Sequence, residues 1–240
     1  MDYEKVIVAL DTPDEKRALQ LVEMLRQKVS TFKVGLELFC SAGPNIINKI
    51  NEQGCKVFLD LKFHDIPNTV AGTARAAVRT GVFMFNLHAS GSSLMMRAAV
   101  KAAREEYEKS PNQLAGNKRP LLLAVTLLTS LNDNDLTQIN IAKPAAQHVV
   151  DLAVLAKKSG MDGVVSSPKE VAEIRRVVGD DFVIVTPGAR PLWAAKDDQK
   201  RIMTPIDAID AGANYIVIGR PVTAAIDPVY AIQRIFHDTL

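Results

Sequence analysis

Two aspartates and a lysine are crowded into one short stretch, DLKFHDIPNTV, which covers residues 60–70. Asp60 and Lys62 are two residues apart, so their side chains point to the same face if this stretch begins as an extended strand. Asp65 follows three residues later. Such a group is either a surface ion pair, which contributes little to stability, or a site where carboxylates hold an ammonium group in place. The stretch alone leaves both interpretations open.

Lys33 favours the second interpretation. It lies in an apolar run earlier in the chain and would supply a second cation beside Asp60. Two lysines and two aspartates would then alternate in one pocket, where the carboxylates keep the Lys62 ammonium charged. A fixed ammonium group of this kind can stabilise negative charge that develops on a substrate. The candidate catalytic residues are therefore Lys62, Asp60, Asp65 and Lys33.

Glycine and arginine residues near the end of the chain form a candidate phosphate site. The stretch TPGAR ends at Arg190, and the stretch IGRP contains Gly219 and Arg220. Gly219 would let the backbone approach an anion, and Arg220 would supply charge. A glycine and an arginine before a proline are often only the start of a helix, so the assignment depends on where the fold places them. The segment between, residues 191–203, is long for a loop and has the length of a lid.

Short apolar, β-branched runs recur along the chain, and each is followed by a longer stretch with helical spacing of apolar residues. The eight runs are residues 6–10, 32–34, 56–61, 84–87, 121–125, 163–165, 182–185 and 215–218. Prolines stand where first helical turns should begin, at Pro13, Pro44, Pro144, Pro168 and Pro205. This alternation predicts an α/β fold, a single-domain (β/α)8 TIM barrel over residues 1–240. An open doubly wound sheet is disfavoured because no GxGxxG follows the first run.

A barrel of this class carries its active site at the carboxyl ends of its strands. Polar or glycine residues stand at or near the end of every run: Asp11, Lys33, Asp60 with Lys62, His88, Thr126, Ser166, Arg190, and Gly219 with Arg220. The loops after the seventh and eighth strands are the usual phosphate site of this fold. That position strengthens the assignment of Arg190, Gly219 and Arg220 to a phosphate group.

The composition excludes several classes of protein. Twenty-nine basic and 27 acidic residues leave a formal charge of +2, spread without a long block of one sign, so neither nucleic acid nor an anionic membrane is an expected partner. No segment approaches the ~20 apolar residues of a membrane span. Cys40 and Cys55 form no CxxC pair, and the four histidines show no ligand spacing around them. We expect a reduced, cytoplasmic protein without a metal site.

Seven stretches together resemble one family, the bacterial orotidine 5′-phosphate decarboxylases. They are VALDTP, FKVG, DLKFHDIPNTV, LLTS, TPGARP, DDQKR and IGRP. The likeness covers nearly the whole chain, and the stretches occur in the order in which the barrel prediction places them. One departure is Ala189, where the family pattern leads us to expect a larger aliphatic residue. That change should alter packing and leave phosphate binding intact.

The resemblance implies a cofactor-free decarboxylation of orotidine 5′-monophosphate. Lys62 would donate a proton to C6 of the pyrimidine, and Asp60 would lie beside the departing carboxylate. Asp65 would reach into the site from a partner subunit, and Thr69 would help from the same loop. Such a shared site would make a homodimer the functional unit.

The resemblance also implies which residues bind the rest of the substrate. Lys33 and Asp11 would contact the ribose hydroxyls, and Thr129 would contact the pyrimidine. Gln199, in the lid, would bridge the base and the phosphate. The phosphate itself would be bound by Arg190, Gly219 and Arg220.

Two alternatives remain at the level of sequence. A Mg²⁺-dependent sugar-phosphate decarboxylase or lyase of the same barrel superfamily would share Asp60, Lys62 and Asp65, but its metal would be repelled by Lys33. A catalytically silent protein that binds nucleotide phosphates would keep Arg190 and Arg220. It would have no need of both lysines.

Overall fold

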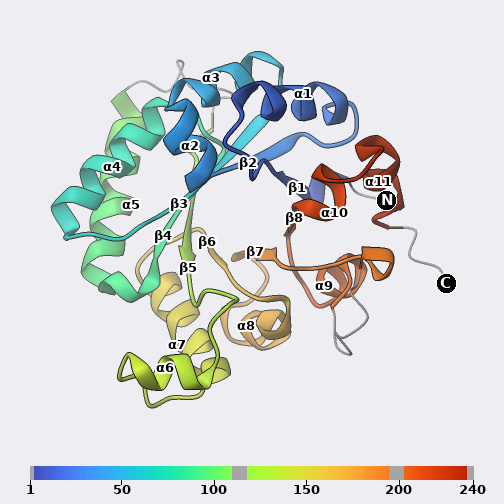
Figure 1. The fold of residues 1–240 in the computed structure, drawn as a ribbon. Coiled ribbons are helices and arrows are strands. Elements are labelled where there is room, and N and C mark those ends of the chain that lie inside the picture. The colour runs from blue at the N-terminus through green and yellow to red at the C-terminus, as the bar shows by residue number, and fades with distance from the viewer. Residues whose placement is uncertain (1–2, 110–117, 195–202, 237–240) are drawn as a thin grey trace.

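The computed structural model describes residues 3–109, 118–194 and 203–236. Within these residues, eight parallel strands pair in chain order, and β8 pairs with β1 to close a barrel that the helices surround (Figure 1). The strands are β1 (Val6–Ala9), β2 (Thr31–Gly35), β3 (Lys56–Phe63), β4 (Met84–His88), β5 (Leu121–Val125), β6 (Gly163–Val165), β7 (Val183–Pro187) and β8 (Tyr215–Ile218). The predicted (β/α)8 fold class is confirmed.

Helices follow the strands and cover the outside of the barrel. They are α1 (Glu15–Leu25), α2 (Leu36–Ala42), α3 (Asn45–Glu52), α4 (Pro67–Arg79), α5 (Ser92–Lys109), α6 (Asp133–Gln138), α7 (Ala145–Lys158), α8 (Val171–Val178), α9 (Pro205–Asp210), α10 (Arg220–Thr223) and α11 (Pro228–Arg234). The 3-10 turns in the described ranges are η1 (Tyr3–Lys5), η2 (Ala89–Gly91), η5 (Pro168–Glu170) and η6 (Leu192–Ala194). None of the helices in the described part of the chain has both the length and the apolar composition of a membrane-spanning segment.

Prolines stand at or directly before the starts of several helices, as the sequence predicts, and a capping side chain begins another. Pro205 opens α9, while Pro44 and Pro144 directly precede α3 and α7. The Asp14 side chain accepts hydrogen bonds from two backbone N–H groups at the start of α1. A proline loses nothing in the first turn, because the N–H groups there have no partner within the helix.

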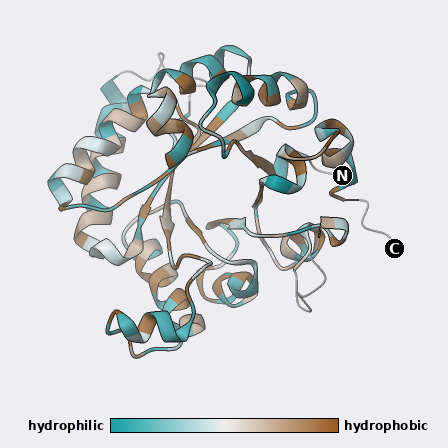
Figure 2. Ribbon diagram, viewed as in Figure 1, coloured by the Kyte–Doolittle hydropathy of each residue, from teal (hydrophilic) through white to brown (hydrophobic). Residues whose placement is uncertain are grey.

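The strands divide the apolar core into two layers because successive side chains point to opposite faces. One set fills the inside of the barrel: Ile7, Ala9, Phe58, Met84, Leu123, Val125, Val165, Val185 and Val217. A larger set packs between the strands and the apolar faces of the helices. Figure 2 shows strands that are mainly hydrophobic and helices whose outer sides carry much of the hydrophilic surface. Inward-facing residues at the carboxyl ends of the strands therefore face the mouth of the barrel.

The carboxyl ends of five strands differ from the predicted runs. β1 stops one residue earlier, at Ala9, and β4 ends one residue later, at His88. β2 extends to Gly35, β7 runs to Pro187, and β3 runs to Phe63. In β3 the pairing with β4 is irregular: Leu59 pairs with Phe85, but the next pair is Phe63 with Leu87. Residues 60–62 of β3 therefore lie opposite the single residue between those partners, Asn86, and form a bulge.

Candidate active site

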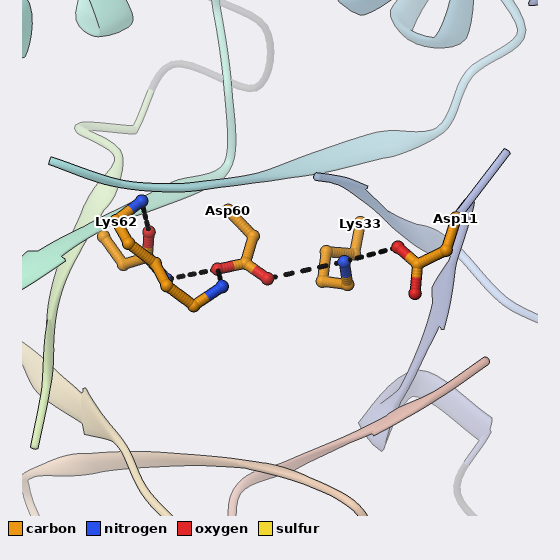
Figure 3. Close-up of polar contacts among 5 residues, drawn as sticks. Asp11, Lys33, Asp60 and Lys62 are labelled. Carbon is orange, nitrogen blue, oxygen red and sulfur yellow. Dashed lines mark hydrogen bonds and ion pairs between the residues drawn. The ribbon is translucent and has the colours of Figure 1, made fainter. Parts of the chain in front are cut away.

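Four charged side chains from the first three strands form a row across the barrel mouth (Figure 3). Lys33 Nζ donates to Asp11 Oδ1 at 2.8 Å and lies 3.4 Å from Asp60 Oδ2. Lys62 Nζ donates to Asp60 Oδ1 at 2.7 Å. The charges alternate along this row, so each lysine has a carboxylate neighbour and Asp60 lies between the two ammonium groups.

Asp60 is the centre of the row and is only 8% exposed. Burial acts to raise the pKa of this carboxyl, but the charges of Lys33 and Lys62 and the hydrogen bonds that it accepts outweigh burial. The pKa of Asp60 therefore lies below its ordinary value. A carboxylate that stays ionised can hold the Lys62 ammonium in one place and present negative charge to the cavity.

Lys62 has a left-handed backbone, with φ of 53°. This conformation is uncommon for a residue with a side chain and costs on the order of 1–3 kcal/mol. Lys62 belongs to the bulge of β3. The two-residue spacing predicted that Asp60 and Lys62 would meet on one face of a regular strand, but here the strand is irregular where their side chains meet. The expected meeting of the two groups occurs, but the bulge produces it.

Asn86, on β4, is a site residue that the sequence analysis did not single out. Its side chain is fully buried, and its Nδ2 donates to Asp60 Oδ1 at 2.7 Å. Its Oδ1 accepts the backbone N–H of Lys62 at 2.8 Å. The available signal was a lone amide inside the apolar run MFNLH, at a position that faces the barrel interior.

A cavity of about 250 Å³ opens beside this row. It is lined by Lys33, Phe58, Asp60, Lys62, Val125, Leu127, Leu128, Thr129, Ser130, Val165, Ser166, Pro187 and Val217. Apolar side chains from the barrel interior form its floor, and the charged row forms one wall. The Thr126 hydroxyl donates to Ser166 Oγ at 3.1 Å and supports the wall on the other side. This lining of apolar and charged side chains suits a small ligand that carries both apolar and polar groups.

The candidate phosphate residues stand at the ends of β7 and β8, as the sequence analysis expects. Gly219 directly precedes α10, and a Cβ built on it would lie 3.7 Å from Asp11 Oδ2. Arg220 is exposed at the first turn of α10, and Arg190 is half-buried after β7. Because β8 pairs with β1, this end of the mouth adjoins Asp11 and the charged row.

Not every candidate lies in the row within a single chain. Asp65 and Thr69 are exposed, in the loop after β3 and in α4. The Asp65 carboxylate accepts the backbone N–H of Ile66 at 2.6 Å. Gln199, and residues 195–202 of the expected lid, lie outside the described residues. The roles of these three side chains stay predictions.

Two histidines flank the row. The rings of His64 and His88 lie with their centroids 5.3 Å apart. Burial, with smaller contributions from His64 and Lys62, lowers the pKa of His88 below its ordinary value. A neutral His88 adds no positive charge beside Lys62 at neutral pH. In the part of the chain that the structure describes, no group of three His, Cys, Asp or Glu side chains could hold a metal ion.

Comparisons with known proteins point to one family. A family model described as "Orotidine 5'-phosphate decarboxylase / HUMPS family" matches residues 4–235. The orotidine 5′-phosphate decarboxylase of a Nostoc species is 49% identical over 239 residues, covering 99% of this chain and 98% of that protein. That of Trichlorobacter lovleyi is 52% identical over 234 residues, covering 98% and 94%.

A solved structure agrees with these relatives. The crystal structure of orotidine 5′-phosphate decarboxylase from Lactobacillus acidophilus superposes with a TM-score of 0.84 at 41% sequence identity. The match covers 98% of each chain. The fold and the sequence therefore lead to the same family.

Proposed function

This chain belongs to the orotidine 5′-phosphate decarboxylase / HUMPS family, and we propose that it converts orotidine 5′-monophosphate to uridine 5′-monophosphate. This reaction is the last step of de novo pyrimidine synthesis. The observation that carries the proposal is the alternating row of Asp11, Lys33, Asp60 and Lys62 beside a cavity with an apolar floor.

The difficulty of the reaction lies at C6 of the pyrimidine ring. Loss of CO₂ leaves an electron pair in the plane of the ring, where no adjacent group can delocalise it. An enzyme must lower the activation free energy of such a reaction by on the order of 20 kcal/mol. A fixed ammonium group next to C6 supplies electrostatic stabilisation at the atom where the charge develops.

Lys62 is the proposed proton donor. The bond between C6 and the carboxylate breaks, the electron pair stays on C6, and CO₂ leaves. The Lys62 ammonium gives its proton to C6, and the resulting amine takes a proton from solvent. Asp60 fixes the ammonium and lies beside the departing carboxylate, so loss of CO₂ relieves the repulsion between two anions.

The remaining contacts bind the nucleotide. Lys33 and Asp11 are assigned to the ribose hydroxyls and Thr129 to the pyrimidine. The phosphate is assigned to Arg190, Gly219 and Arg220, and Gln199 is assigned to bridge base and phosphate. Two observations support this: Thr129 lines the cavity, and a Cβ built on Gly219 would lie 3.7 Å from Asp11 Oδ2, as expected if ribose and phosphate bind side by side. Binding energy from the phosphate can then orient the ring against Lys62.

The functional unit proposed is a homodimer in which Asp65 and Thr69 enter the partner's site. Asp65 is exposed, and the residue next to it, Ile66, is a large apolar side chain with 66% of its surface exposed. Leu94, at the start of the adjacent helix α5, is 65% exposed. Exposed apolar side chains beside a charged loop are typical of a protein interface.

The Mg²⁺-dependent sugar-phosphate alternative is disfavoured. The relatives that match over nearly the full length are named orotidine 5′-phosphate decarboxylases. The Lys33 ammonium also lies between the carboxylates of Asp11 and Asp60, where it would repel a divalent cation.

One assay tests the proposal. Loss of orotidine 5′-monophosphate absorbance is followed with the purified protein, with and without EDTA. We expect turnover that EDTA leaves unchanged. Absence of turnover would overturn the proposed function, and turnover of a sugar phosphate that EDTA abolishes would favour the alternative.

We also propose a cytoplasmic location, which the free thiols of Cys40 and Cys55 support.

A further inference from the structure

The bulge in β3 makes the position of Lys62 depend on a neighbouring strand. Leu59 and Phe63 pair regularly with β4, but residues 60–62 lie opposite Asn86 alone. One residue of β4 cannot provide backbone hydrogen bonds for three residues of β3. The Lys62 backbone N–H therefore donates to the side-chain Oδ1 of Asn86, at 2.8 Å. This bond is made by a residue with left-handed backbone geometry.

The same amide also fixes the acidic partner of Lys62. Asn86 Nδ2 donates to Asp60 Oδ1 at 2.7 Å, and this oxygen accepts the Lys62 ammonium as well. A triangle results: the amide binds the Lys62 backbone and the Asp60 carboxylate, and the Lys62 side chain binds the carboxylate. With Asn86 fully buried, water cannot replace either of its bonds without entering the core.

We propose that Asn86 is a positioning residue for the decarboxylation, holding the Lys62 backbone and the Asp60 carboxylate so that the ammonium faces C6. The inference rests on the proposed function. Asn86 acts through Lys62 and Asp60 and needs no contact with the substrate. Its side chain must accept one hydrogen bond and donate another, and an amide does both at any pH.

The surroundings of Asn86 make a titration test readable. The charged groups facing it are Asp60 and Lys62 from β3 and, two residues along its own strand, His88 with its neighbour His64. On the other side, β5 pairs Leu123 with Asn86, and its inward side chains are apolar. A carboxyl group placed at position 86 would therefore interact most directly with the Asp60 carboxylate.

The first variant removes both hydrogen bonds and keeps the branching and the number of heavy atoms of the side chain. Asn86→Leu should lower kcat by about 100-fold, because a misplacement of about 1 Å at the reacting group has an effect of this size. Binding of uridine 5′-monophosphate, measured by calorimetry, should change little, because the phosphate and ribose contacts are intact. The matched control is Thr186→Val, which removes from β7 a buried hydroxyl that has no hydrogen-bond partner among the described residues. It should leave kcat unchanged.

The second variant keeps the shape and makes the donor depend on pH. In Asn86→Asp, a protonated carboxyl can still donate to Asp60 and accept from the Lys62 N–H, whereas an ionised one can only accept and repels Asp60. Two carboxyl groups that share one proton have one strongly raised pKa. Relative to wild type at each pH, kcat of this variant should be highest in acid and should fall as the pH rises.

The outcomes separate the two proposals. Wild-type turnover tests the proposed function by itself, and the ratio of each variant to wild type tests the role of Asn86. Asn86→Leu with a kcat within about twofold of wild type overturns the inference, as does an Asn86→Asp ratio that is flat over the whole pH range in which wild type is active. If Asn86→Leu fails to fold, as judged by circular dichroism, the pH ratio of Asn86→Asp decides, because it compares one folded protein with itself.

Discussion

At the scale of single residues, the chemistry depends on charge held in place. Asp60 is buried between Lys33 and Lys62, and its pKa is held below the ordinary value despite its burial. The arrangement gives Lys62 a carboxylate partner that stays ionised throughout the neutral range. Lys62 can therefore be tested by its effect on turnover, and Asp60 by its effect on stability.

Removal of the Lys62 ammonium should abolish turnover without preventing binding. Lys62→Ala loses both the proton donor and the charge that stabilises the carbanion, so kcat should fall by roughly 10⁴-fold or more. Calorimetry should show that uridine 5′-monophosphate still binds. Lys158→Ala, which removes an exposed lysine at the end of α7, serves as the control. Substantial turnover by Lys62→Ala would refute the assignment of Lys62.

The low pKa of Asp60 predicts how stability changes with pH. A group whose pKa is depressed by folding stabilises the protein above its unfolded pKa, near 3.8, and this contribution is lost as the pH falls through the lower folded pKa. We therefore expect the free energy of unfolding of wild type minus that of Asp60→Asn to be constant near neutrality and to shrink below pH 3.8. Urea unfolding at several pH values measures this difference. A difference that does not vary across the acid range would contradict the role given to the lysines.

At the scale of elements, two strands depart from simple barrel geometry. The bulge in β3 lets residues 60–62 face one residue of β4 and turns Lys62 toward the mouth. At β6 the backbone comes so close to β7 that a Cβ on Gly163 would lie 2.2 Å from the Val183 carbonyl oxygen. Apolar side chains thus fill the barrel interior, and at Gly163 the absence of a side chain lets β6 and β7 approach closely.

The close approach at β6 can be tested directly. Gly163→Ala should force β6 and β7 apart and lower the free energy of unfolding by about 3 kcal/mol, the upper range for an overpacked core. Gly54→Ala is the matched control, since a Cβ there meets no atom of the described residues within 4 Å and its positive φ of 76° costs about 1–2 kcal/mol. Thermal or urea unfolding compares the two variants. An equal or smaller loss at Gly163 would show that crowding does not limit this position.

At the scale of the whole molecule, Asp65 lies outside the charged row of its own chain. The row lies in the barrel mouth, whereas Asp65 is exposed beside Ile66. The proposed dimer would join them, with Asp65 from each subunit completing the site of its partner. This proposal makes a quantitative prediction for mixed dimers.

Mixing two inactive variants should restore activity if the site is shared. A dimer of one Lys62→Ala subunit and one Asp65→Ala subunit has one site with both changes and one intact site. Random exchange makes half of the dimers mixed, so about a quarter of wild-type activity should return. A mixture of Lys62→Ala with Asp60→Asn is the control. Lys62 and Asp60 both act in the site of their own chain, so each site of a mixed dimer carries one of the two changes and no intact site forms. No recovery, with subunit exchange demonstrated, would argue for self-contained sites.

Much of this protein follows from local sequence. The eight strands, the helices between them and the polar residues at the strand ends come from patterns within a few residues, so the barrel and the grouping of Lys33, Asp60 and Lys62 could be anticipated. The second aspartate of the row within one chain is Asp11, whereas the sequence analysis grouped Asp65 with the lysines. The family could be anticipated too, because its characteristic stretches occur in order along the chain.

Only the tertiary structure decided how Lys62 is held. The spacing of Asp60 and Lys62 suggested a regular strand, but the pairing of β3 with β4 contains a bulge and Lys62 is left-handed. The groups that stabilise this geometry come from far along the chain, since Asn86 is 24 residues from Lys62 and 26 from Asp60. Strand register is set by the summed packing and hydrogen bonds of both strands, and no local pattern encodes that sum. The residues proposed for the reaction therefore stand out in the sequence, whereas the side chain that supports them is identified only from the pairing of strands in the closed barrel.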